Sequence, residues 1–196
     1  PDRDQEIAAI NHVISKIDSK NIIELPEECH VEGGDVMPYG NYIFVGTYYG
    51  DDYSSYITAR TNMAAVTALQ ELFPKKIVKP FNLKKSNTVA QDNALHLDCC
   101  FQPLGHGRCI IHKDGFLLEE EYKWLVDFFG PQNCFHIDKQ EMYHMNSNIF
   151  SISEDVIISE KNFTRLNSWL VDKGYTVEEV CYSEIAKQEG LLRCST

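Results

Sequence analysis

This sequence of 196 residues has little positive charge, because 18 lysine and arginine residues face 29 aspartate and glutamate residues. The formal net charge of −11 argues against nucleic acid or an anionic membrane as the main partner, since both bind basic surfaces. Apolar runs approaching the roughly 20 residues of a membrane span are also absent, and we expect no signal peptide. The sequence therefore predicts a protein that uses neither nucleic acid nor a membrane as its partner.

Paired metal-binding cysteines and phosphate-binding loops are missing as well. The seven cysteines are odd in number and irregularly spaced, which is a poor disulfide framework, so we expect a reduced cytoplasmic compartment. The adjacent Cys99 and Cys100 do not easily face one ion, and no CxxC pair accompanies them. Gly33-Gly34 precedes an expected strand rather than a helix, which excludes a phosphate loop. We expect neither a metal nor a cofactor.

Enough apolar sequence is present for one packed domain. Hydrophobic residues make up 43% of the chain, an ordinary share for a globular protein. A chain of this length can bury a sizeable core without disulfides or metals. We therefore expect residues 1–196 to form a single domain.

A pattern of hairpin, helix and strand recurs three times, at intervals of roughly 50 residues. Alternating apolar residues on either side of glycine-containing or acidic turns indicate the hairpins, and apolar residues at helical spacing indicate the helices. The predicted hairpins, helices and strands are 35–46, 63–72 and 76–79, the last ended by Pro80; 96–112, 118–129 and 133–137; and 148–159, 163–173 and 175–180.

Incomplete units flank these three. Residues 5–25 have the pattern of a helix and strand from an earlier unit, and a short helix at 183–189 leads to Cys194, where another hairpin would begin. Repeated units of this type favour a radial arrangement of ββαβ units around an axis, with an ordinary α+β sandwich as the alternative. The expected buried face of the first helix is Ile7, Ile10, Val13, Ile14 and Ile17.

A radial arrangement would bring the strand starts together. Asp35, Asp98, Asn148 and Cys194 occupy matching positions in successive units, with His96 two residues before Asp98. A thiol, an imidazole and several carboxylates would then share one pocket. These groups can serve as a nucleophile, a general acid/base and ligands for a cation.

Four motifs in this order resemble the guanidino-group-modifying superfamily, which includes arginine deiminases, dimethylarginine dimethylaminohydrolases and amidinotransferases. The motifs are EGGDV at Glu32–Val36, RTN at Arg60–Asn62, HLD at His96–Asp98 and EGLLRCST at Glu189–Thr196. The resemblance extends from about residue 5 to residue 196. It implies an α/β propeller (pentein) of ββαβ units around a pseudo-fivefold axis, with the first and last units incomplete in this chain.

The resemblance also implies a role for each matching residue. Cys194 would be the nucleophile, His96 the acid/base group and Glu32 the carboxylate that pairs with the histidine. Asp98 would bind the substrate guanidinium, and Arg60 would face a substrate carboxylate. Asp35 would be a second substrate contact or a structural cap of its turn.

Two parts of the family pattern have no counterpart in this sequence. The second guanidinium-binding aspartate of the family belongs to the first blade, and a further strand follows the nucleophile. We therefore expect residues 1–196 to be part of a longer protein and not to act alone.

The resulting prediction is an amidinohydrolase of the arginine deiminase type. It would convert the guanidino group of arginine or an arginine derivative to a ureido group and ammonia through a covalent cysteine intermediate. An amidinotransferase with an amine acceptor is the enzymatic alternative, and a non-catalytic propeller that binds a macromolecule is the alternative of another class. A small cationic guanidino compound is the expected partner, and a homo-oligomer is left open.

Overall fold

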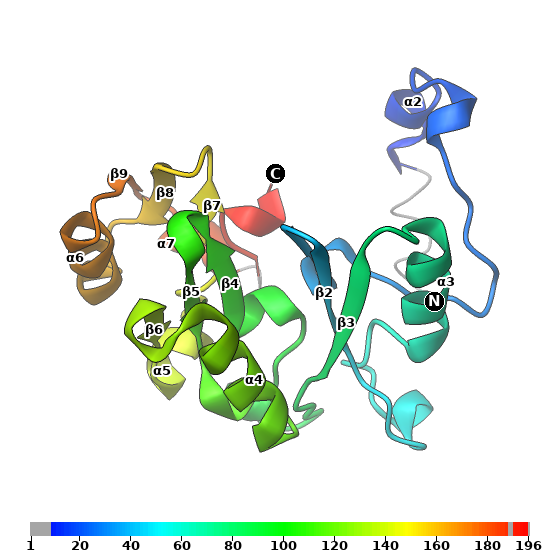
Figure 1. The fold of residues 1–196 in the computed structure, drawn as a ribbon, viewed down its shortest axis with the longest axis horizontal. Helices are drawn as coiled ribbons and strands as arrows, with labels where there is room; N and C mark the ends of the chain where they lie inside the picture. Colours follow the sequence, from blue (N-terminus) through cyan, green and yellow to red (C-terminus); the bar gives the residue numbers. More distant parts are fainter. Residues whose placement is uncertain (1–8, 188–189, 196) are drawn as a thin grey trace.

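The computed structural model describes residues 9–187 and 190–195, which contain three separate three-stranded sheets (Figure 1). In each sheet the first two strands form an antiparallel hairpin, and the third strand pairs in parallel with the second. A helix lies between the second and third strands in the sequence. The predicted α/β class and the threefold recurrence of hairpin, helix and strand are confirmed, whereas an arrangement around a pseudo-fivefold axis stays a prediction.

The first unit contains β1 (Val36–Tyr39), β2 (Tyr42–Thr47), α3 (Met63–Leu72) and β3 (Ile77–Asn82). Gly40 turns the hairpin with a φ of +52°, a conformation that glycine adopts without steric cost. The side chain of Asn62 caps α3 by accepting a hydrogen bond from the Ala65 N–H.

The expected end of β3 at Pro80 is wrong, because the strand continues to Asn82. β3 is an edge strand, where a residue without an N–H is tolerated. Prolines also lie in β1 and in β4, which are edge strands of the first two sheets.

The second and third units follow the same plan. The second contains β4 (Phe101–Leu104), β5 (Arg108–Ile111), α4 (Glu119–Phe129) and β6 (Cys134–His136). The third contains β7 (Phe150–Ser151), β8 (Val156–Glu160), α6 (Thr164–Asp172) and β9 (Thr176–Val180). Between them lies α5 (Lys139–Tyr143), and α7 (Ser183–Ala186) follows the third unit.

Two hairpins start later than expected. The strand predicted from His96 begins at Phe101, and the strand predicted from Asn148 begins at Phe150. Local hydrogen bonds replace the expected ladder, since the N–H of Cys99 reaches the carbonyl of His96 and the N–H of Asn148 reaches that of Met145. The chain therefore turns tightly just before each strand.

The expected helix and strand of an earlier unit are largely wrong for residues 9–25. Only α2 (Asn11–Ile14) and a 3-10 turn occur there, and residues 22–25 form no strand. Ile10, Val13 and Ile17 are 46–52% exposed, so they are not a buried face, and Ile14 is only partly buried. Figure 1 shows α2 standing away from the three sheets. Ile7 lies outside the described residues.

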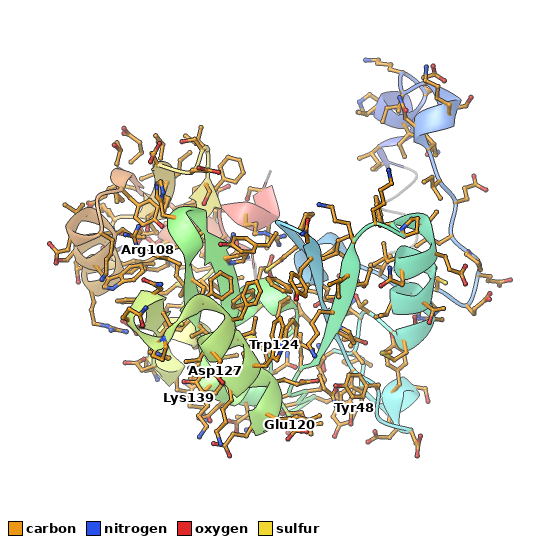
Figure 2. All side chains as sticks on the ribbon, viewed as in Figure 1. Tyr48, Arg108, Glu120, Trp124, Asp127 and Lys139 are labelled. Atoms are coloured by element: carbon orange, nitrogen blue, oxygen red, sulfur yellow. The ribbon has the colours of Figure 1, made fainter. Side chains whose placement is uncertain are left out.

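Aromatic rings pack the first unit against the second. Trp124 of α4 lies 5.7 Å from Tyr42 of β2 and 6.0 Å from Phe81 of β3, measured between ring centroids. Figure 2 shows Trp124 on the side of α4 that faces these strands. At the next junction, Trp169 of α6 lies 5.1 Å from Phe135 of β6. Both tryptophans therefore join neighbouring units, and one hydrophobic cluster includes residues of all three.

Candidate active site

Three short 3-10 turns carry chemically active residues. Gly33–Asp35 precedes β1, Leu97–Cys99 precedes β4, and Arg193–Ser195 forms the last turn that the structure describes. The last turn lies between the first and third sheets in the centre of the molecule (Figure 1). The three turns therefore bring Glu32, His96, Asp98 and Cys194 together from distant parts of the sequence.

These four residues line one cavity of about 550 Å³. Its lining combines polar groups with apolar side chains at and just before the start of β7. The remaining lining residues are Gly33, Gly34, Leu95, Gln102, Ile149, Phe150, Ser151 and Arg193. A cavity of this size and mixed polarity suits a small polar ligand.

Glu32 and His96 form a close pair. Glu32 Oε2 lies 2.6 Å from His96 Nε2, and the other oxygen, Oε1, accepts a hydrogen bond of 3.3 Å from Arg60 Nη1. Only 13% of the His96 side chain is exposed. The carboxylate therefore orients the imidazole. Arg60 contacts Glu32 but does not line the cavity.

Gly34 makes room for this imidazole. A Cβ at position 34 would lie 2.9 Å from both Cγ and Nδ1 of His96, which is closer than real Cβ contacts allow. A Cβ at the neighbouring Gly33 would meet no described atom within 4 Å. The position of the His96 ring therefore requires a glycine at position 34 but not at position 33.

Asp98 is bound by a guanidinium of the chain itself. Its side chain is 1% exposed, and Oδ2 accepts a hydrogen bond of 2.8 Å from Arg193 Nη1. Arg193 Nη2 also donates to the carbonyl of Val36 at 3.0 Å. Because a buried carboxylate needs a cation or hydrogen-bond donors, Arg193 supplies a partner that Asp98 requires.

Cys194 lies beside the same carboxylate. Its Sγ is 3.7 Å from Asp98 Oδ2 and 3.1 Å from Asn148 Nδ2. Partial burial and the Asp98 charge raise the pKa of the Cys194 thiol, whereas the hydrogen bond from Asn148 lowers it. The Cys194 sulfur therefore lies between Asp98, which opposes its ionisation, and Asn148, which favours it.

Asp35 lies behind the cavity rather than on its wall. It is 1% exposed and accepts hydrogen bonds of 2.6 Å from Thr61 Oγ1 and 2.9 Å from the N–H of Leu97. Lys85, also buried, donates to the carbonyls of Ala94 and Leu95, next to His96. These contacts fix the segment that carries the histidine, so the geometry favours the structural alternative for Asp35.

The strand-start pattern placed Asn148 with Asp98 and Cys194, but no motif assigned a role in this site to Asn148 or to Arg193. Arg193 contacts Asp98, 95 positions earlier, and Asn148 contacts Cys194, 46 positions later. Such contacts have no local pattern in the sequence, although Asn148 does hold the strand-start position that also predicted Asp98 and Cys194. The described residues contain no group of three or more His, Cys, Asp and Glu side chains placed to hold a metal ion.

Comparison with known proteins gives one curated relative and several solved structures. No family model matches the sequence. The uncharacterized protein YkgA of Bacillus subtilis is 27% identical over 167 residues, which are 85% of this chain and 51% of that protein. The chain therefore spans about half the length of its curated relative.

Two solved structures illustrate the structural likeness. The N-terminal domain of ArgZ, an arginine dihydrolase from the ornithine-ammonia cycle in cyanobacteria, has a TM-score of 0.73 and 20% identity, covering 89% of this chain and 58% of that one. A cysteine-to-serine mutant of DDAH from Pseudomonas aeruginosa, complexed with citrulline, has a TM-score of 0.73 and 21% identity, covering 98% of this chain and 65% of that one. The chain thus shares its fold with guanidino-modifying enzymes of the pentein superfamily, and the predicted resemblance is confirmed at that level. No helix among the described residues is long and apolar enough to cross a membrane.

Proposed function

We propose that this chain carries the thiol chemistry of a guanidino-group hydrolase that acts on arginine or an arginine derivative. The observation that supports the proposal is the single cavity lined by Cys194, His96, Glu32 and Asp98. A flat guanidinium is cationic and resonance-stabilised, so its carbon is a poor electrophile. A carboxylate that fixes its plane, with a sulfur to one side, provides what such a substrate needs.

Substrate binding would begin at Asp98. This carboxylate already holds the Arg193 guanidinium at 2.8 Å, so its surroundings suit a group of that shape and charge. A substrate cation would share Asp98 with Arg193 or replace it there. The added positive charge would offset the negative charge that raises the pKa of Cys194, so the thiolate would form as the substrate binds.

The reaction then proceeds in two stages. The Cys194 thiolate attacks the guanidinium carbon, a C–S bond forms, and protonated His96 donates its proton to the departing nitrogen, which leaves as ammonia. Neutral His96 next takes a proton from a water molecule as that water attacks the amidino carbon. The C–S bond breaks, the ureido product leaves and the thiolate is restored. Glu32 would orient and stabilise the imidazolium in both stages.

Replacement of the sulfur tests the proposal. Cys194→Ser should fold like the parent chain and release ammonia from arginine at least 1,000-fold more slowly, about 4 kcal/mol of barrier, as measured by coupled ammonia and ureido-product assays on the full-length protein. Cys181→Ser, an exposed cysteine that does not line the cavity, is the matched control and should keep full turnover. Equal turnover by parent and Cys194→Ser would overturn the proposal.

The same assay separates the alternatives. An amidinotransferase would transfer the amidino group only when an amine acceptor is added, whereas a hydrolase forms the ureido product in water alone. A haloacetamidine, a cationic thiol reagent, should label Cys194 in preference to the other six cysteines, and arginine should protect it. Labelling without selectivity would favour a binding module.

A further inference from the structure

Asn148 is a buried amide that contacts the cavity cysteine through both of its ends. The residue is 0% exposed. Its Nδ2 donates to Cys194 Sγ at 3.1 Å, and its Oδ1 accepts a hydrogen bond of 3.3 Å from the Cys194 N–H. Its backbone carbonyl also accepts from the Arg193 N–H at 3.4 Å. Both ends of the Asn148 amide and its backbone carbonyl therefore bind the segment formed by Arg193 and Cys194.

This bidentate contact determines where the sulfur lies. An amide that accepts from the cysteine N–H and donates to its Sγ restrains the χ1 rotation of that side chain, since both contacts are satisfied together in few orientations. The neighbouring Ser147 donates its hydroxyl to the carbonyl of Asp98 at 2.8 Å. The buried residues Ser147 and Asn148 thus support both the 3-10 turn that carries Asp98 and the 3-10 turn that carries Cys194.

We propose that Asn148 is a positioning residue that aims the Cys194 sulfur into the cavity and stabilises its thiolate by donating a hydrogen bond. The inference rests on the proposed role of Cys194 as nucleophile, and it adds a residue that acts through the sulfur without touching the substrate. A donated hydrogen bond strengthens when its acceptor becomes an anion, so the amide favours the thiolate over the thiol.

The charged groups around the sulfur explain why such a donor is needed. Asp98 lies 3.7 Å from Sγ and opposes its ionisation, and a second carboxylate, Glu32, lines the same cavity. Arg193 and His96 also line the cavity, but each is engaged with one of these carboxylates. The Cys99 thiol lies close by on the Asp98 turn. Asn148 donates to the sulfur from a neutral side chain, in addition to the hydrogen bond from the Leu191 backbone.

The pH dependence of Cys194 alkylation tests this proposal independently of turnover. Iodoacetamide is neutral and reacts with thiolates, so its rate at Cys194, followed by peptide mass spectrometry across pH 6–11, reports the ionisation of that thiol. Asn148→Asp keeps an oxygen to accept from the Cys194 N–H but exchanges the donor for an acceptor. The midpoint of the alkylation profile should move upward by about one pH unit.

Asn146→Asp is the matched control. Asn146 is also buried and lies two residues away in the same segment, yet its Oδ1 has no hydrogen-bond partner among the described residues, and it does not line the cavity. The same change of charge there should leave the Cys194 midpoint within about 0.3 units of the parent, since the Asn146 side chain makes no hydrogen bond to Cys194 among the described residues. Cys181, which is exposed, provides an internal reference thiol in every sample.

A second variant keeps the test decisive if Asn148→Asp does not fold. Asn148→Ser carries a hydroxyl too short to reach both Sγ and the Cys194 N–H, and it should raise the midpoint by about half a unit. Equal midpoints in the parent and in the folded Asn148 variants, or an equal shift in Asn146→Asp, would overturn the assignment. The parent protein could fail to hydrolyse guanidino compounds while the Asn148 variants still shift the alkylation midpoint of Cys194. In that case the contact between Asn148 and Cys194 is upheld, and only the proposed function is contradicted.

Discussion

At the scale of single residues, burial changes the acidity of a carboxyl group that lies behind the cavity. Asp35 is buried beside the histidine segment, and burial raises the pKa of its carboxyl from 3.8 to about 6, although His96, Lys85, Thr61 and the Leu97 N–H lower it in part. The folded chain therefore binds the Asp35 proton more tightly than the unfolded chain does. The stabilisation from this group is complete below pH 3.8 and is lost as the pH rises through about 6.

Asp35→Asn should remove this pH dependence. The interval between a pKa of 3.8 and one of about 6 corresponds to about 3 kcal/mol, so the parent should gain up to that amount relative to the variant as the pH falls from 7 to 4. Urea unfolding of both proteins across this range measures the difference. Parallel stability curves would show that Asp35 ionises as freely in the folded chain as in the unfolded one.

The sequence predicted the residue types of the site better than their contacts. A thiol, an imidazole and carboxylates were recognisable because they stand in short motifs, and the structure brings Cys194, His96, Glu32 and Asp98 to one cavity. Arg193 and Asn148 were not assigned because nothing in a linear pattern shows that an arginine will turn back toward a carboxylate 95 positions earlier. Their contributions depend on orientation, which only the folded chain determines.

Among the elements, the short turns before the strands matter more than the strands themselves. The sequence pattern correctly indicated the order of hairpins and helices, since apolar periodicity and glycine turns are local features. It placed His96 and Asn148 inside strands, because it could not anticipate that hydrogen bonds within the turns would delay β4 and β7. The turns let polar side chains point into the cavity where a regular strand would alternate them between two faces.

The Gly33–Asp35 turn offers a test with a built-in control. Gly34→Ala would place a Cβ 2.9 Å from the His96 ring, so the ring should move away from Glu32 and turnover should fall at least tenfold, because the imidazole is then misaligned. Gly33 also lines the cavity, but a Cβ there meets no described atom within 4 Å, so Gly33→Ala should lower turnover less than Gly34→Ala does. Steady-state kinetics with circular dichroism of both variants provides the comparison, and equal kinetics would contradict the packing argument.

On the scale of the whole molecule, the three units are joined by polar as well as aromatic contacts. Glu121 of α4, in the second unit, accepts hydrogen bonds from the Asn82 N–H at 2.6 Å and from the hydroxyl of Tyr49 in the first unit. Tyr175, beside the third unit, donates to the carbonyl of Gly105 at 2.5 Å. Because the cavity takes residues from all three units and from the last turn, it depends on all of these junctions.

Glu121→Ala should therefore destabilise the units together. Two partners lose their acceptor, one of them a buried N–H, which costs about 2–3 kcal/mol. Urea unfolding followed by Trp124 fluorescence in a Trp169→Phe background, and by Trp169 fluorescence in a Trp124→Phe background, should show the same loss at both probes. A change confined to Trp124 would mean that the third unit unfolds on its own.

The prolines of the edge strands have a consequence for the behaviour of many copies of the chain. Pro38 in β1, Pro80 in β3 and Pro103 in β4 each remove an amide hydrogen from a strand that borders its sheet. A strand from another polypeptide that approached these borders would find the row of donors interrupted. Both borders of the first sheet and one border of the second are thereby protected from adding foreign strands, and crowded molecules can collide along these borders without being drawn into fibrils.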